Sequence, residues 1–120
     1  MTSARPWPSE LRLNKAKDLL TLQFDNGRTH ELTAEYLRVE SPSAEVKGHG
    51  PGERQTVPGK ARVKIDRLEP VGNYAVRIIF DDGHDTGLYS WSYLLELAEE
   101  KDTRWPAYLE ELAVQGLSRD

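Results

Sequence analysis

Alternating apolar and polar residues predict a β-hairpin early in the chain. The alternation runs on both sides of the turn sequence Asp-Asn-Gly at residues 25–27. A three-residue turn pairs Leu22 with His30 and keeps every apolar side chain on one face, whereas a two-residue turn pairs Leu22 with Glu31. The three-residue turn is therefore expected, with Gly27 in the left-handed region. The predicted strands are Leu19–Phe24 and Thr29–Leu32.

The same reasoning predicts the remaining elements. A short helix follows the hairpin, with Thr33 as its N-cap and Pro42 beyond its end. Two helices close the chain, the first capped by Ser90 and the second with Pro106 in its first turn. Their apolar spacing of three and four residues predicts buried stripes of Trp91, Leu94, Leu95 and Ala98, and of Trp105, Tyr108, Leu109, Leu112 and Ala113. The other predicted elements are strands at Glu10–Leu13, Arg62–Leu68 and Tyr74–Phe80 and a helix at Ala34–Glu40.

Together these elements predict an α+β fold, a small antiparallel sheet domain with one early helix and two C-terminal helices. A chain of 120 residues is long enough for one domain, expected over residues 1–120. Residues 41–60 are rich in glycine, proline and charge and are expected to form a flexible loop, and residues 117–120 a tail. The stretches FDNGRTHELTAEYL and FDDGHDTGLYSWSYL share a turn, a strand and a Tyr-Leu pair. Two strand–turn–strand–helix units explain this as well as coincidence between two good turn sequences.

Composition narrows the classes of function. The net charge of -4 and the pI of about 5.4 argue against nucleic acid and anionic membranes as partners. The chain has no cysteine, which excludes disulfides and thiolate-bound metals and fits the cytoplasm. No apolar run approaches the roughly 20 residues of a membrane span, and the first residues lack the apolar core of a signal peptide. We expect a cytoplasmic monomer.

His84 is the main candidate for chemistry. A three-residue turn at residues 81–83, like the first, pairs His84 with Phe80 and Thr86 with Ile78. The imidazole then lies on the face of Phe80 or at its rim. It is interpreted as a partly buried histidine bonded to backbone or carboxylate, and a ligand role is the alternative. Arg62, Lys64 and Arg67 form a basic stretch in this acidic chain, which is a solvated strand face or a surface for a protein partner.

Enzyme motifs are missing from the sequence. The three histidines do not show the His-x-Asp spacing of a non-haem iron oxygenase. Ser90 and Ser92 follow His84 closely, but no Gly-x-Ser-x-Gly turn of a hydrolase is present. The GHGPGER stretch lacks the Lys-Ser/Thr of a phosphate-binding loop.

The stretches FDDGHDTGLYSWSYL and YLRVESPSAEVKGHG resemble the gamma-butyrobetaine hydroxylase-like N-terminal domain family, over roughly Trp7 to Leu112. In the oxygenases of this family, the resemblance implies a zinc site made by a Cys-x-Cys-x-x-Cys run and the histidine of an Asp-Gly-His turn. Carried onto this chain, the cysteines fall on Ser41, Ser43 and Val46 and the histidine falls on His84. Similar domains also accompany P-loop ATPases that carry iron–sulfur clusters.

Two hydroxyls and an isopropyl group do not replace three thiolates, so zinc binding in the oxygenase manner is not expected. The alternative is a divalent metal bound without thiolates, such as iron or zinc, held by His84 with His49, Glu45 or an aspartate; an exposed loop position is the simpler interpretation of His49. The leading prediction is a non-catalytic binding or accessory module without a cofactor, serving an oxygenase or an iron–sulfur assembly system. A metal-binding domain centred on His84 is the second prediction, and a small hydrolase or an oxygenase fragment is the third.

Overall fold

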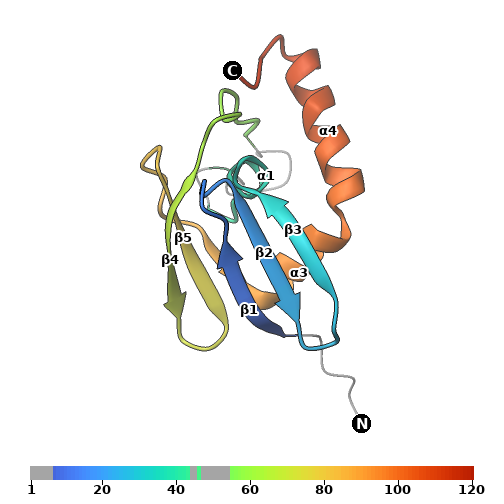
Figure 1. Ribbon diagram of the computed structural model, residues 1–120. Coiled ribbons are helices and arrows are strands. Elements are labelled where there is room, and N and C mark those ends of the chain that lie inside the picture. The colour runs from blue at the N-terminus through green and yellow to red at the C-terminus, as the bar shows by residue number, and fades with distance from the viewer. Residues whose placement is uncertain (1–6, 44–45, 47–54) are drawn as a thin grey trace.

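The computed structural model describes residues 7–43, 46 and 55–120 (Figure 1). Its strands are β1 (Pro8–Leu13), β2 (Leu19–Phe24), β3 (Thr29–Thr33), β4 (Ile65–Val71), β5 (Ala75–Phe80) and β6 (Leu88–Ser90), and its helices are α1 (Ala34–Val39), α3 (Trp91–Glu99) and α4 (Lys101–Val114). The strands form two three-stranded antiparallel sheets, ordered β1-β2-β3 and β4-β5-β6. The α+β class, the short early helix and the two C-terminal helices predicted from the sequence are confirmed.

The first hairpin has the predicted register. Leu20 pairs with Leu32 and Leu22 pairs with His30, on either side of the three-residue turn. The Phe24 amide donates to the Arg28 carbonyl at 2.8 Å, and Gly27 adopts a φ of 85°. Side-chain alternation fixes the register here because a slip of one residue would expose the apolar face.

The predicted bounds of two strands in the second sheet are wrong. β4 begins at Ile65 instead of Arg62, because the Lys64 amide bonds the Asp81 carboxylate at 3.0 Å and ends the preceding turn. At its other end β4 continues through Pro70 to Val71. The connecting turn contains Tyr74, which is 54% exposed instead of sharing the buried face of Val76.

The turn after β5 confirms part of the predicted pairing. The Phe80 amide donates to the His84 carbonyl at 3.0 Å across the three-residue turn. The predicted pairing of Thr86 with Ile78 is wrong, since the Ile78 amide donates to the Gly87 carbonyl. One extra residue is accommodated before β6, and the freed Thr86 hydroxyl lies 2.7 Å from the Ser43 hydroxyl.

The helix caps match the sequence, but the interior of the last helix does not. The side chains of Thr33 and Ser90 accept the amides of Tyr36 and Tyr93, as N-caps do. α4 begins only one residue after α3 ends, so Pro106 lies inside the helix and not in its first turn. The predicted stripes are also narrower than expected: Trp91 is half-buried, Ala113 is exposed and Leu109 is 38% exposed.

The two halves of the chain have the same order of elements. Each half contains three strands followed by a helix, β1-β2-β3-α1 and β4-β5-β6-α3. Two tyrosines exchange hydrogen bonds between the halves: the Tyr36 hydroxyl donates to the Leu97 carbonyl in α3, and the Tyr93 hydroxyl donates to the Glu40 carbonyl at the end of α1. The structure therefore supports the two-unit interpretation of the sequence.

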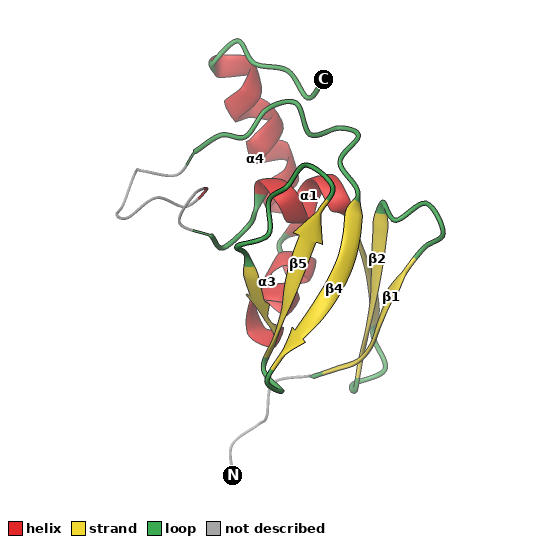
Figure 2. Ribbon diagram, turned by 90° about the vertical axis from the view of Figure 1, so that its left-hand side faces the viewer, coloured by secondary structure: helices red, strands yellow, loops and turns green. Residues whose placement is uncertain are grey.

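The main apolar core joins the two sheets to α1 and α3, and a smaller cluster of Val39, Tyr108 and Leu112 joins α4 to α1. The main core contains Leu22 and Phe24 from β2, Ile78 from β5 and Leu94 from α3, all nearly inaccessible to solvent. Figure 2 shows the helices on one side of the strands, with α4 extending beyond them. No helix in the described part of the chain is long and apolar enough to cross a membrane.

Candidate functional site

His84 is buried at the start of the chain segment that leads to β6. Its ring is 6.1 Å from the Phe80 ring, and 7% of the residue is exposed. Its Nε2 lies 2.9 Å from the Ser41 Oγ, on the segment that follows α1. The predicted position against Phe80 is confirmed, and the partner of Nε2 is a serine hydroxyl.

The positions that the resemblance aligns with zinc ligands gather near this histidine. Ser41 and Ser43 are buried, and the Ser43 amide donates to the Ser41 Oγ at 3.2 Å. The Ser43 hydroxyl meets Thr86, two residues beyond His84. Val46 is also buried, and its amide donates to the Ser43 carbonyl at 3.0 Å. The fold thus brings the family's ligand positions together with different side chains in them.

These side chains do not fit zinc. Serine hydroxyls are poor zinc ligands compared with thiolates, the valine has no donor, and one imidazole does not hold the ion alone. Across residues 7–43, 46 and 55–120, no group of three His, Cys, Asp or Glu side chains is arranged to hold a metal ion. His49 and Glu45, which the alternative prediction adds to His84, lie outside the described residues.

Asp82 forms a charged cluster beside the buried hydroxyls. Its Oδ2 accepts from Arg38 Nε at 2.8 Å and from Lys60 Nζ at 2.6 Å, and its Oδ1 accepts the His84 amide at 3.0 Å. Burial raises the pKa of Asp82, but the bonds from Lys60, His84 and Arg38 outweigh it and lower the pKa to about 2. The carboxylate therefore stays ionised and ties the turn to α1 and to the segment before β4. The sequence identified Asp82 as a turn residue, and no local signal indicated its distant partners.

Tyr89 and Gly87 pack tightly against Ser41. The Tyr89 hydroxyl donates to the Leu37 carbonyl, and burial raises the pKa of Tyr89 well above its usual value. A Cβ added at Gly87 would lie 2.6 Å from the Ser41 Oγ and 3.0 Å from the Tyr89 ring. Ser41 itself is 0% exposed. The Ser41–His84 pair combines a hydroxyl with an imidazole, and this packing leaves the hydroxyl without solvent exposure.

Ser90 and Ser92, the serines that the sequence places near His84, lie at the start of α3 in the structure. Ser90 caps α3, and Ser92 is exposed on that helix. The serine that contacts His84 is Ser41, which the hairpin sequence alone did not indicate because 43 residues separate the two.

The predicted basic surface is partly neutralised. Arg67 donates to Asp66 at 2.9 Å and to Glu69 at 3.1 Å, so its charge is balanced on its own strand. Arg62 and Lys64 are exposed just before β4. A protein partner at these residues stays a prediction.

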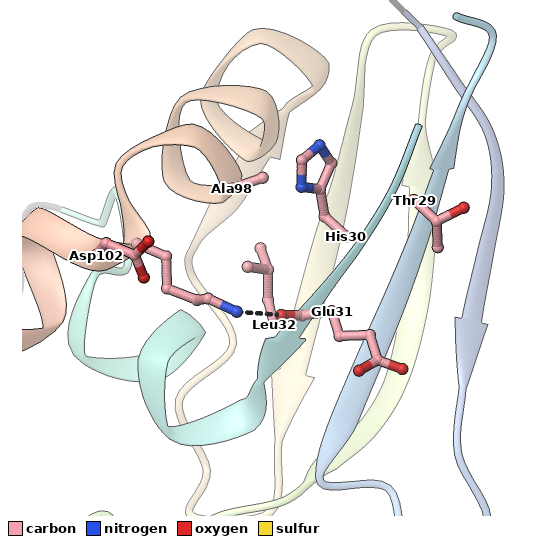
Figure 3. A pocket seen from close by; sticks show the side chains of 7 residues that line it. Thr29, His30, Glu31, Leu32, Ala98 and Asp102 are labelled. Carbon is pink, nitrogen blue, oxygen red and sulfur yellow. Dashed lines mark hydrogen bonds between the residues drawn. The ribbon is translucent and has the colours of Figure 1, made fainter. Parts of the chain in front are cut away.

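A groove lies between the outer edge of β3 and the junction of α3 with α4 (Figure 3). It encloses about 460 Å³ and is lined by Thr29, His30, Glu31, Leu32, Ala98, Lys101 and Asp102. The Lys101 ammonium donates to the Glu31 carbonyl at 3.2 Å, across the groove. Sequence analysis missed this groove because its walls are about seventy residues apart in the chain.

A second groove, of about 400 Å³, shares Lys101 and Asp102 with the first. Arg119 fills part of its wall, donating to both oxygens of the buried Glu35 at 2.8 and 2.6 Å. The guanidinium also lies 5.5 Å from the Trp105 ring. The tail is therefore anchored by its arginine to α1 and α4.

Comparisons with known proteins agree with the resemblance. The family model described as gamma-butyrobetaine hydroxylase-like, N-terminal, matches residues 11–95. Two structures determined by NMR in solution are 49% and 47% identical, with TM-scores of 0.84 and 0.83; they cover 98% and 99% of this chain and 92% and 90% of their own. A crystal structure from Acidithiobacillus ferrooxidans ATCC 23270, described as a protein of unknown function of the DUF971 family, is 38% identical with a TM-score of 0.64. It covers 77% of this chain and 92% of its own. No curated protein matched the chain.

Proposed function

Because the chain belongs to the gamma-butyrobetaine hydroxylase-like N-terminal family, we propose that it is a cytoplasmic, non-catalytic accessory module that acts by binding another protein. Its partner is a metalloenzyme, such as an oxygenase, or a component of an iron–sulfur system. The module contributes a folded surface and leaves the chemistry to the partner.

The closed packing around His84 carries this proposal. A catalytic centre needs a reactive group that a substrate reaches. Ser41 is fully buried, His84 is nearly so, and Asp82 is engaged by Arg38 and Lys60. The residues that would perform chemistry are therefore used to hold α1, the turn after β5 and the segment before β4 together.

A labelling experiment tests the non-catalytic half. The full chain is treated with a fluorophosphonate probe, which reacts with activated serines, and Ser41→Ala serves as the matched control. We expect no labelling of either protein. Labelling of the native chain that disappears in Ser41→Ala would establish an active nucleophile and contradict the proposal.

A binding experiment tests the other half. The products of genes adjacent to this one are mixed singly with the purified chain and analysed by size-exclusion chromatography with light scattering. We expect a stoichiometric complex with one catalytic or cluster-carrying protein. A chain that turns over a substrate without any partner would refute the accessory role.

A further inference from the structure

The outer edge of β3 differs from the other sheet edges in lacking a proline, a register shift and a very short strand. Exposed edges are normally blunted by proline, by bulges or by short length, which prevent unwanted strand pairing. β1 begins with Pro8 and has a register shift, β4 contains Pro70 and a register shift, and β6 has only three residues. β3 has no proline and pairs with β2 over five residues without a shift.

The free backbone groups of β3 face the groove. Alternate residues of a strand point their amide and carbonyl groups to opposite sides. Because the Phe24 amide bonds Arg28, the groups of His30 point towards β2 and those of Thr29 and Glu31 point outward. Lys101 confirms this orientation, since its ammonium bonds the outward Glu31 carbonyl. Within the described part of the chain, that bond is the one contact to the outward groups of Thr29 and Glu31.

The second half of the chain shows what a covered edge looks like in this fold. There the segment Ser41–Ser43, just after α1, packs against the chain that leads into β6, with Ser41 on His84 and Ser43 on Thr86. At the corresponding place in the first half, after α3, the helix junction stands off from β3 and leaves the groove of about 460 Å³. The segment after the helix therefore covers its neighbouring strand segment in the second half of the chain, whereas in the first half it leaves a groove beside β3.

We propose that the β3 edge binds an extended segment of a partner protein, which adds to the first sheet as a fourth strand and lies between β3 and the α3–α4 junction. This proposal rests on the proposed function, and it identifies the surface through which the module would bind its partner. A peptide amide replaces Lys101 at the Glu31 carbonyl, and its neighbours bond the free groups of β3. In this position, one face of the incoming strand is exposed to solvent and the other faces the groove.

The charge of Glu31 and the two faces of the sheet determine which side chains the bound segment can carry. A residue opposite Glu31 places its side chain on the solvent face, beside the exposed carboxylate, so a basic residue fits there. The residues on either side of it point to the other face, where Leu32 and Ala98 favour small apolar side chains. A second copy of this chain fits less well, because its β3 would bring another Glu31 carboxylate to the solvent face beside this one, while its Lys101 already bonds its own Glu31 carbonyl.

The test uses a blocked peptide, acetyl-Thr-Val-Lys-Val-Thr-amide, titrated into the full chain labelled with ¹⁵N. We expect saturable shifts of the amides of residues 28–33 and 98–102, with a Kd on the order of 1 mM, since a short flexible strand must be ordered on binding. The same peptide with N-methyl-lysine lacks the central amide donor and is expected not to bind. The Thr-Val-Glu-Val-Thr analogue is expected to bind about two- to fivefold more weakly, the range of an exposed cross-strand charge pair.

Charge-reversal variants locate the contact. Glu31→Lys is expected to invert the preference, so that the Glu peptide binds more tightly than the Lys peptide. Glu10→Lys, on the β1 edge of the same sheet, is the matched control and is expected to leave the preference unchanged.

Three results would overturn the inference: no saturable shift in residues 28–33 at 5 mM peptide, unaltered binding of the N-methyl peptide, or self-association of the chain through β3. Each is distinguishable from a failure of the proposed function, which is reported by labelling of Ser41 or by turnover without a partner. A complex with a neighbouring gene product that leaves the β3 amides unshifted would keep the accessory role and refute this surface.

Discussion

Replacing Asp82 by asparagine tests whether the charged cluster at the turn after β5 stabilises the fold. Asparagine keeps an oxygen for the His84 amide but removes the charge that holds Arg38 and Lys60. A hydrogen bond to a charged group contributes about 1.5–3 kcal/mol. Asp82 lies in an exposed turn and 18% of its side chain is exposed, so water partly screens its ion pairs with Arg38 and Lys60 and lowers their contribution. We expect a loss of about 1–3 kcal/mol in the free energy of unfolding at pH 7.

The pH dependence isolates the contribution of the charge. Asp82 has a pKa of about 2 in the folded chain, against an ordinary value of 3.8, so between these values the unfolded chain binds more protons. The stabilisation is complete above the ordinary pKa and is lost as the pH falls through about 2. In urea denaturation, the difference between native chain and Asp82→Asn is therefore expected to narrow as the pH falls from 5 to 2.

Asp85→Asn is the matched control, because Asp85 is exposed in the same hairpin and is expected to change stability by less than about 0.5 kcal/mol. An equal effect of the two substitutions, or a difference for Asp82→Asn that does not vary between pH 5 and pH 2, would show that the ion pairs contribute nothing.

Three further predictions address the packing and the metal. Gly87→Ala is expected to lower the free energy of unfolding by about 1–3 kcal/mol, because its Cβ meets Ser41 and Tyr89; thermal melting measures it, and an unchanged melting temperature would contradict the close approach. Trp91→Ala is expected to cost about 2 kcal/mol, less than the 3–5 kcal/mol of a fully buried tryptophan, because the side chain packs against the core but is only half-buried; a loss above 4 kcal/mol in thermal or urea denaturation would show deeper burial. Elemental analysis after expression with added zinc is expected to find no stoichiometric metal, and one zinc per chain that His84→Ala removes would overturn this.

The parts of the fold predicted correctly are those fixed by neighbouring residues. The first hairpin follows from alternation and a glycine turn, and the caps at Thr33 and Ser90 follow from side chains bonding amides three residues away. The start of β4 was missed because a distant residue decides it, through the bond between Asp81 and Lys64. Apolar Val63 is buried without belonging to the strand, so periodicity alone misplaced the boundary.

The candidate site shows the same division between local and distant information. The placement of His84 against Phe80 follows from the turn, whereas its contact with Ser41 depends on packing α1 against the second sheet. The resemblance pointed to Ser41 and Ser43 as ligand positions, but it did not predict how their hydroxyls would be used. The groove beside β3 had no sequence signal, because its two walls, β3 and the α3–α4 junction, are about seventy residues apart in the chain.

The resemblance aligns Ser41 and Ser43 with zinc-binding cysteines, and serine in these positions changes what can hold this region together. A zinc ion joins its ligands through strong bonds, and folding then depends on metal supply. Here Ser41 bonds His84, Ser43 bonds Thr86, and Asp82 binds Arg38 and Lys60. Each bond is individually weak, but together they join the same segments without a metal. For the accessory role proposed above, this arrangement would let the domain present its surface independently of metal supply.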